Sequence, residues 1–446
     1  MIADVLSRSL PGVVEYWRPI DPSDGAYSVD GVQPSFVCEP GTPEEVAAIL
    51  GLAHRERAAV TPRGGGARMS VGFPPRQADI VLLTGRLSGV VEYEPADLTV
   101  TVQAGMPFAA LQTLLRDHGQ MLAMDPPAAD RSTIGGIVAS NSSGPMRLLY
   151  GTARDLVIGT RVANAEGMLT KSGGRVVKNV SGYDLNKLYT GSYGTLGVIV
   201  ELSFKLHPLP QGQGTLLAIF SSVERAQDCV QRIVKSPLGP AALTIVSVST
   251  ARAILHHEVP AGGVALIAMA AGFERAVERQ IRDMAVLCGE ALITDTPESP
   301  EAEEIWAAVR RFADLTEATS DAILKLSVPP ARSGAALQTL AALSVVCELP
   351  LDSLAYAGTG VVFARVHLPG SSDARSLEGL VRLVTEARAW AHALRGSLVV
   401  EHCPSGLKET LDVWGDVGSS FRVMQALKEQ FDPAGVLNPG RFVGHL

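Results

Sequence analysis

The sequence has few cysteines, and they are scattered. Its 446 residues include only Cys38, Cys229, Cys288, Cys347 and Cys403, with no Cys-x-x-Cys pair. An iron–sulfur cluster needs grouped thiolates, and a disulfide framework is marked by an even set of cysteines at short spacings. We therefore expect buried free thiols and no cluster held by this chain.

Long apolar runs and basic runs are also missing. The longest apolar stretches, residues 263–271 and 195–200, fall well short of the roughly 18 residues of a membrane span. The net charge is −8 and no run of lysine or arginine occurs, which argues against nucleic acid or an anionic membrane as the main partner. The N-terminus has Asp4 and no basic region before an apolar one. We expect a cytoplasmic protein with no direct membrane insertion, either free or held at the inner membrane through partners.

A dinucleotide fingerprint of the Rossmann type is missing too. No Gly-x-Gly-x-x-Gly follows a first strand with an acidic residue about 20 positions later, so NAD binding of that kind has no support. What the sequence does have is glycine, with 44 residues that cluster most densely at residues 132–144. The hydrophobic fraction of 46% predicts a large buried core, and the length predicts two or three domains.

The first glycine cluster follows a strand–helix–strand pattern. A short strand is expected at residues 36–40 and a helix at 42–54, where Thr42 is the N-cap and Glu45 completes a capping box. A second strand at 59–62 leads into Arg-Gly-Gly-Gly-Ala at 63–67. Backbone N–H groups in such a turn can approach a pyrophosphate closely, because no Cβ is in the way. Taken alone, the loop also fits a flexible surface turn.

The second cluster, residues 132–144, has the same two interpretations. Ser132 or Thr133 is expected to cap a short helix, and hydroxyl, amide and glycine N–H groups at a helix N-terminus bind phosphate. A packed glycine turn fits equally well. Strands are expected on either side, up to Pro208 and Pro210, where we place a domain boundary.

Beyond that boundary the glycine clusters thin out. Residues 211–400 alternate predicted strands and helices in the α+β manner. The tail has a helix at 423–431, followed by Asp-Pro-Ala-Gly-Val-Leu-Asn-Pro-Gly-Arg at 432–441, where two prolines and two glycines predict a defined turn.

Taken together and in order, these motifs resemble the FAD-binding domain of the vanillyl-alcohol-oxidase/PCMH flavoprotein family. The matching segments are residues 63–66, 103–105, 125–126, 133–136, 141–144, 150–151, 154–155, 178–184, 191–199 and 431–441. Within the family, residues 176–184 and 412–415 are most similar to FAD-binding subunits of bacterial glycolate oxidases.

The resemblance implies an α+β fold, with a PCMH-type two-subdomain FAD-binding domain and an α+β cap of the FAD-linked oxidase C-terminal type. We expect an N-terminal lead-in at 1–32, the FAD domain at 33–210, the cap at 211–405 and a tail at 406–446 that returns to the FAD domain.

The resemblance also implies which residues contact FAD. The first loop would hold the pyrophosphate, residues 133–144 would lie along the flavin and its ribityl chain, residues 197–199 would reach the adenine end, and Asn438 would reach the isoalloxazine. The full set is Pro62, Arg63, Gly64, Gly65, Gly66, Ala67, Met69, Asp125, Thr133, Ile134, Gly135, Gly136, Ala139, Asn141, Ser142, Gly144, Tyr150, Gly197, Val198, Ile199 and Asn438. Some relatives attach FAD through a histidine in the first loop. Residues 63–69 have none, so we predict non-covalent FAD.

The substrate side departs from the family pattern. Relatives that oxidise D-2-hydroxy acids carry two metal-binding histidines around a Gly-Asp-Gly-Asn segment, whereas this chain has Tyr356 and Phe363 at those positions and Thr359 in place of the aspartate. Neither aromatic ring binds metal as imidazole does, so we expect no metal site. The later pair Glu401-His402 is present. His402, beside Glu401, is either a base that takes the hydroxyl proton or a remnant of a degenerate pocket.

We expect the FAD-binding subunit of a glycolate-oxidase-type complex that acts on a small 2-hydroxy acid. A second flavin subunit and an iron–sulfur subunit are the expected partners. Two alternatives stay open, namely a stand-alone FAD-linked oxidoreductase that uses His402 as its base, and a non-catalytic, flavin-bearing scaffold.

Overall fold

The computed structural model describes residues 2–21, 25–174, 182–255, 257–315, 321–368 and 373–446. Its contacts divide the chain into two units. Unit 1 comprises residues 1–143, 152–208 and 416–446, and unit 2 comprises residues 144–151 and 209–415. The α+β prediction is confirmed, since helices and sheets occur in both units.

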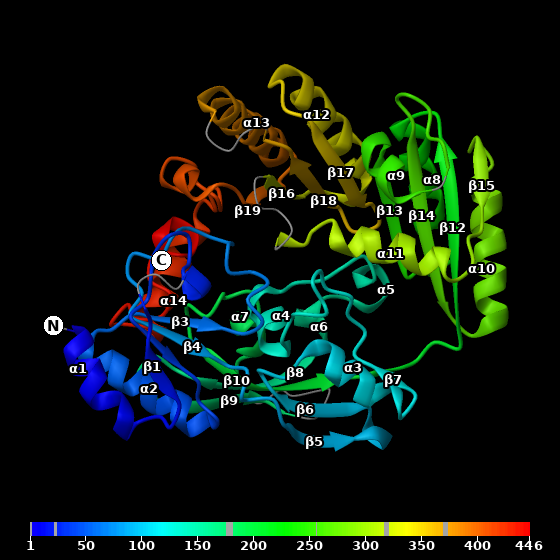
Figure 1. The fold of residues 1–446 in the computed structure, drawn as a ribbon. Coiled ribbons are helices and arrows are strands. Elements are labelled where there is room, and N and C mark those ends of the chain that lie inside the picture. The colour runs from blue at the N-terminus through cyan, green and yellow to red at the C-terminus, as the bar shows by residue number, and fades with distance from the viewer. Residues whose placement is uncertain (1, 22–24, 175–181, 256, 316–320, 369–372) are drawn as a thin grey trace. The chain divides into compact units, whose positions relative to one another are not determined.

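Unit 1 begins with a small sheet in the order β1-β2-β4-β3 (Figure 1). Its strands are β1 (Trp17–Pro19), β2 (Phe36–Cys38), β3 (Val60–Arg63) and β4 (Ile80–Leu83). Both β2 and β3 run parallel to β4, and helix α2 (Pro43–Glu56) connects β2 to β3. This helix starts as expected, because the N–H of Glu45 donates to Thr42 Oγ1 at 3.1 Å. The Glu45 carboxylate accepts from the N–H of Gly41 rather than from that of Thr42.

A second, antiparallel sheet of unit 1 has the order β5-β6-β10-β8-β9. Its strands are β5 (Val90–Glu94), β6 (Thr99–Gln103), β8 (Val157–Ala163), β9 (Leu169–Gly173) and β10 (Val198–Lys205). Helices α3 (Phe108–Arg116), α4 (Ile134–Ser140), α6 (Ala153–Leu156) and α7 (Asn186–Tyr189) accompany it. The apolar side chains of β6, β10, α3 and α4 share one core, which fixes α4 against this sheet. Strands β7 (Gln120–Met121) and β11 (His207–Pro208) form a separate pair.

Unit 2 contains an antiparallel sheet in the order β15-β12-β14-β13-β17-β18-β16-β19. Its strands are β12 (Gly212–Phe220), β13 (Ala242–Ser247), β14 (Val264–Gly272), β15 (Ile293–Asp295), β16 (Ala322–Ser327), β17 (Leu351–Tyr356), β18 (Val361–Val366) and β19 (Ser397–His402). Its helices are α5 (Arg147–Tyr150), α8 (Val223–Lys235), α9 (Val248–Ile254), α10 (Glu274–Leu287), α11 (Glu301–Arg311), α12 (Ser333–Val346) and α13 (Ala374–Ala393). Helices α13, α12, α8 and α10 pack one against the next in that order (Figure 1).

The structural units differ from the predicted domains in three places. The lead-in at 1–32 belongs to unit 1, because β1 pairs with β2 and helix α1 (Ile2–Ser9) packs on α2. The segment 144–151 groups with unit 2, and unit 2 extends to Gly415 rather than ending near 405. All five cysteines are free thiols; four are buried as predicted, whereas Cys347 is half-buried. Among the described residues, no helix is long and apolar enough to cross a membrane.

Candidate functional site

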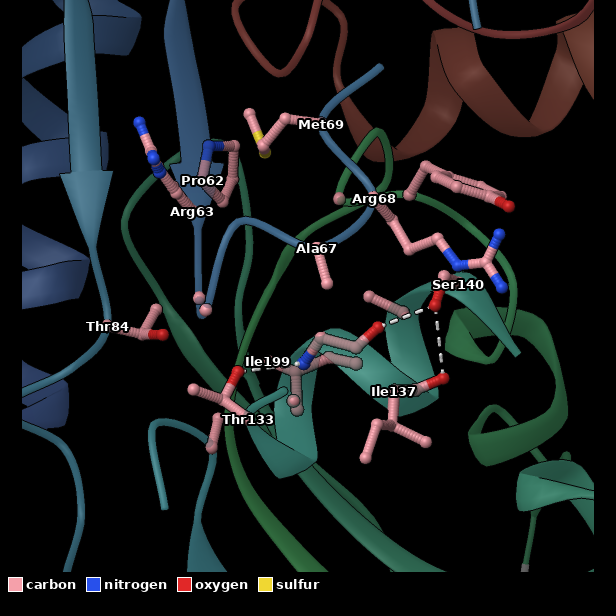
Figure 2. A pocket seen from close by; sticks show the side chains of 18 of the residues that line it. Pro62, Arg63, Ala67, Arg68, Met69, Thr84, Thr133, Ile137, Ser140 and Ile199 are labelled. Atoms are coloured by element: carbon pink, nitrogen blue, oxygen red, sulfur yellow. Dashed lines mark hydrogen bonds between the residues drawn. The ribbon is translucent and has the colours of Figure 1, made fainter. Parts of the chain in front are cut away.

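A cavity lies within unit 1, where the glycine-rich segments meet (Figure 2). Its walls come from the loop after β3, from α4 with the residues before it, from residues 193–199, and from the tail. Four segments that lie far apart in the sequence therefore line one cavity.

The loop after β3 forms one wall, and its glycines are required by the protein's own packing. A Cβ on Gly64 would lie 2.2 Å from Thr133 Oγ1, and one on Gly65 would lie 1.7 Å from the carbonyl oxygen of Arg131. Gly66 has φ +81°, a conformation that glycine adopts without strain. The loop therefore packs directly against the segment that leads into α4.

Helix α4 forms the facing wall. Thr133 is its N-cap, as one of the two sequence predictions had it, and Thr133 Oγ1 accepts from the N–H of Gly136 at 3.3 Å. Ser140 Oγ donates to the carbonyl of Gly136 at 2.8 Å (Figure 2). The helix ends at Asn141, which has φ 48°. A Cβ on Gly135 would lie 2.7 Å from Cβ of Ala104, so this glycine lets the helix pack closely against the residue that follows β6.

The tail supplies a third wall. The N–H of Asn438 donates to the carbonyl of Val60 at 3.0 Å, and its Nδ2 donates to the carbonyl of Tyr193 at 2.7 Å. Asn438 Oδ1 is buried and has no hydrogen-bond partner among the described residues. A buried amide oxygen without a donor is costly, so this atom is a candidate ligand contact.

The cavity fits FAD in its charge and in its donors. Its lining, within the described residues, includes three arginines and no aspartate or glutamate, which suits a diphosphate. The N–H groups of residues 64–67 donate no hydrogen bond to a backbone carbonyl in the described part of the chain. Consecutive N–H groups of this kind form anion-binding concavities. The residues present therefore match the anionic part of FAD.

Sixteen of the predicted FAD contacts line this cavity. They are Pro62, Arg63, Gly64, Gly65, Gly66, Ala67, Met69, Thr133, Gly135, Gly136, Ala139, Ser142, Gly197, Val198, Ile199 and Asn438. Five others do not line it, namely Asp125, Ile134, Asn141, Gly144 and Tyr150. The side chain of Ile134 is in the core, and Gly144 and Tyr150 belong to unit 2. The motif at 176–181 lies outside the described residues.

The cavity also has lining residues that sequence reasoning missed: Arg68, Thr84, Ala104, Ser132, Ile137, Ser140, Tyr193, Gly194 and Arg441. Ser140 was within reach of prediction, because it lies one helical turn beyond Gly136 on the predicted helix. Thr84 directly follows β4 and gave no sign in the sequence of facing a ligand, whereas Ala104 lies in the matching segment 103–105 but was not named as a contact.

The side chains of two arginines hold the loop in place. Arg63 Nη1 donates to the carbonyl of Ala26 at 2.6 Å, and its guanidinium lies over the ring of Tyr27. Arg441 donates to the carbonyls of Met69 and Val71. Burial lowers the pKa of Arg441 to about 10. The guanidinium of Arg63 therefore ties the loop to the lead-in, and that of Arg441 ties it to the tail.

In unit 2, the sequence-predicted substrate residues lie on neighbouring strands. Tyr356 ends β17 and Phe363 lies on β18, and both rings are buried in an edge-to-face contact with centroids 5.5 Å apart. Glu401 is also buried, and its carboxylate lies 3.2 Å from Nζ of Lys325 on β16. The pairing of β16 and β19 shifts register between Ile323 and Leu324, next to Glu401 and His402. Such bulges redirect side chains at the end of a strand.

Comparisons with known proteins cover both units. A family model described as an FAD binding domain matches residues 34–173, and one described as the C-terminal domain of FAD linked oxidases matches residues 209–442. The glycolate oxidase subunit GlcD of Bacillus subtilis (strain 168) is 30% identical over 92% of this chain and 88% of its own length. The D-lactate dehydrogenase of Archaeoglobus fulgidus is 28% identical over 98% of this chain and 99% of its own length.

Solved structures share the fold at low sequence identity. The 4-ethylphenol oxidase of Gulosibacter chungangensis has a TM-score of 0.76 at 16% identity, over 98% of this chain and 96% of its own. A p-cresol methylhydroxylase has a TM-score of 0.76 at 14% identity, over 99% and 96%. The predicted fold class, the FAD cofactor and the FAD-dependent oxidoreductase class are confirmed by these matches. The chain belongs to the FAD-linked oxidases, and its cofactor is FAD.

Proposed function

We propose that this protein is the FAD-binding subunit of a complex that oxidises glycolate or a similar small 2-hydroxy acid. A second flavin subunit and an iron–sulfur subunit would complete the complex and carry the electrons onward. The observation that supports this most is similarity over both units to proteins named for 2-hydroxy acids, the glycolate oxidase subunit and the D-lactate dehydrogenase.

The chemistry divides between the two units. Bound FAD supplies the acceptor for two electrons from the carbon that bears the hydroxyl. The cavity of unit 1 binds the cofactor through the loop N–H groups and Asn438. The reaction also needs a group that accepts the hydroxyl proton, and His402 is the candidate in unit 2.

The surroundings of His402 favour a role for this chain as an accessory subunit over a role as a self-sufficient enzyme. The neighbouring acid Glu401 is paired with Lys325, so its charge is already compensated. The resemblance places metal-binding histidines at positions 356 and 363. Here these positions are Tyr356 and Phe363, whose buried rings pack against each other. A chain without those imidazoles would depend on a partner subunit for part of the substrate site.

Co-purification with native partners tests the proposal. The complex would be isolated through a tag on this chain, and flavin and iron would be counted per chain. We expect more than one flavin per copy of this chain, together with iron, and glycolate-driven reduction that is much faster in the complex than in the chain alone. A chain that purifies alone in active form, without iron, would contradict the proposal.

A second candidate is a stand-alone oxidoreductase in which His402 is the base. The half-buried imidazole at the end of an edge strand, beside a buried acid, favours it. It predicts that purified FAD-loaded chain reduces its flavin anaerobically with glycolate or D-lactate, and that His402→Gln slows this by about 100-fold or more. The third possibility, a scaffold role, predicts full complex activity after FAD is lost from this chain.

A further inference from the structure

Two buried cysteines of unit 2 lie side by side, although 59 positions separate them in the sequence. Cys229 lies within helix α8 and Cys288 is the C-cap of helix α10, and their sulfur atoms are 3.2 Å apart. Both residues are fully buried. The two helices pack against each other and against β12 and β14 (Figure 1). The tertiary fold therefore holds the two thiols together.

The two sulfur atoms could form a covalent bond with little movement. A disulfide has its sulfur atoms about 2.05 Å apart, so the present distance of 3.2 Å would have to shorten by about 1.2 Å. Cys229 lies in the interior of α8, whereas Cys288 lies where α10 has already ended. The end of a helix frays more readily than its interior. The Cys288 side of the pair can therefore supply the movement.

The surroundings make the two thiols unequal. The hydrogen bond with Cys288 lowers the pKa of Cys229, burial opposes this effect, and the nearby guanidinium of Arg232 adds to the lowering. The same hydrogen bond and burial raise the pKa of Cys288. Cys229 is therefore the sulfur that ionises first. A thiolate, and not a thiol, is the nucleophile in thiol oxidation.

The pair lies just beneath a group of surface charges. Arg232 interacts with the Cys229 thiol and donates to the carbonyl of Leu287 at 3.1 Å. It also pairs with Glu290 at 3.4 Å, and its side chain is 38% exposed. Deep burial would keep a thiol inert. Here a partly exposed arginine side chain covers the thiol, so a molecule as small as hydrogen peroxide has a short path to Cys229 when that side chain moves.

We propose that Cys229 and Cys288 form a reversible redox site that hydrogen peroxide closes into a disulfide bond. The Cys229 thiolate attacks one peroxide oxygen, the O–O bond breaks, and the sulfur becomes a sulfenic acid while the leaving hydroxide takes up a proton. The Cys288 sulfur then attacks the Cys229 sulfur, the S–O bond breaks, and the departing hydroxide takes the Cys288 proton. The two thiols lose two electrons and two protons, and one peroxide becomes two molecules of water.

This redox site is separate from the FAD cavity and from the predicted substrate residues. Helices α8 and α10 pack on β12 and β14, whereas His402 lies on β19 at the opposite edge of the same sheet. The inference goes beyond the proposed function, because neither FAD nor a 2-hydroxy acid takes part. A disulfide can be reduced again, whereas a sulfenic acid without a second thiol can proceed to the irreversible sulfinic acid. The neighbouring thiol therefore makes oxidation of Cys229 reversible.

The test is a time course of the FAD-loaded chain in hydrogen peroxide. Free thiols are then alkylated in denaturant, and the peptides are identified by mass without reduction. We expect a cross-linked pair of peptides that contain Cys229 and Cys288, and dithiothreitol should restore both thiols. Cys38 is the internal control, because it is equally buried and burial raises its pKa to about 12. The two paired thiols should disappear at least about ten times faster than that of Cys38.

Two variants separate the roles of the two sulfurs. In Cys288→Ala the sulfenic acid at Cys229 lacks its resolving thiol and should be trapped by dimedone. In Cys229→Ala the same dose of peroxide should leave Cys288 a free thiol. Cys229 and Cys288 that remain free thiols after Cys38 has been oxidised would overturn the proposal, and so would dimedone labelling of Cys288 in Cys229→Ala. The time course uses the unaltered chain, so it decides the matter even where a variant does not fold.

Discussion

The ammonium group of Lys428 lies 2.7 Å from the carboxylate of Asp432, and both side chains are buried. Lys428 Nζ also donates to the carbonyls of Thr195 and Leu437, each at 2.9 Å. The carboxylate of Asp432 accepts from the N–H groups of Val436 and Leu437. This pair joins helix α14 (Ser420–Phe431), the turn after it and the segment before β10, and so positions the cavity wall that carries Asn438.

Removal of Lys428 should destabilise unit 1. Burial lowers the pKa of Lys428, and the neighbouring Asp432 carboxylate opposes this effect by stabilising the ammonium group. The folded chain therefore contains Lys428 and Asp432 as an ion pair. Lys428→Met would leave a buried carboxylate without its cation, and we expect a loss of about 3–5 kcal/mol in the free energy of unfolding, with weaker FAD binding. Urea unfolding measures this. Glu429→Gln, an exposed neighbour on the same helix, should stay within about 0.5 kcal/mol of wild type, and an equal effect of the two changes would argue against the pair.

The tail should be necessary for FAD binding. A chain that ends after Phe431 lacks Asn438, Arg441 and the bridge between Val60 and Leu437. We expect it to purify without flavin. Because truncation also removes core side chains, Asn438→Ala is the sharper variant. It should keep the wild-type far-UV circular dichroism and bind FAD at least about tenfold more weakly, since it removes the orphan oxygen from the cavity. Full flavin content in both variants would contradict the role of the tail in FAD binding.

FAD should dissociate from the denatured chain. No histidine occurs among residues 63–69, the loop in which some relatives attach the cofactor. Acid precipitation should leave the flavin in the supernatant and a colourless pellet. A yellow pellet whose peptides carry a flavin mass would show a covalent bond that the sequence did not predict.

The thiol of Cys38 should make the fold sensitive to alkali. Burial raises the pKa of Cys38 from 9.0 to about 12. The unfolded chain loses this proton near pH 9.0, whereas the folded chain holds it, so the folded state binds more protons and its stability falls as pH rises above 9.0. Cys38→Ala should remove a slope of about 1.4 kcal/mol per pH unit in that window. Parallel stability curves for the two proteins above pH 9.0 would refute this.

Local signals in the sequence predicted local structure well. Thr42 and Thr133 act as N-caps because a cap needs only its own side chain and an N–H two or three residues later. Gly64 and Gly65, which were predicted to hold a pyrophosphate, line the cavity, but the protein's own packing also requires them to be glycine. Their missing side chains make room for Arg131 and Thr133, nearly 70 residues later, and periodicity does not register such a contact.

Contacts between distant segments explain what sequence reasoning missed. The three residues of β1 are too few to show a strand pattern. The pairing of β1 with β2 and the packing of α1 on α2 bring the lead-in into unit 1. In the sequence Arg68 looks like an ordinary loop residue, because its hydrogen bond to Ser142 joins segments that only the fold brings together. On the substrate side, the edge-to-face packing of Tyr356 and Phe363 depends on the register of β17 and β18, which the sequence does not specify.

The central claim is that FAD in this chain takes part in oxidation of a 2-hydroxy acid. Ala67 lines the cavity at a half-buried loop position and points toward α4 (Figure 2), so Ala67→Trp should fill the cofactor space while the rest of unit 1 folds. The decisive measurement is glycolate-dependent reduction of an electron acceptor by the complex assembled with this variant. We predict a complex that has its normal subunits, lacks the flavin of this chain and loses nearly all activity. Wild-type activity in a complex without that flavin would contradict the claim.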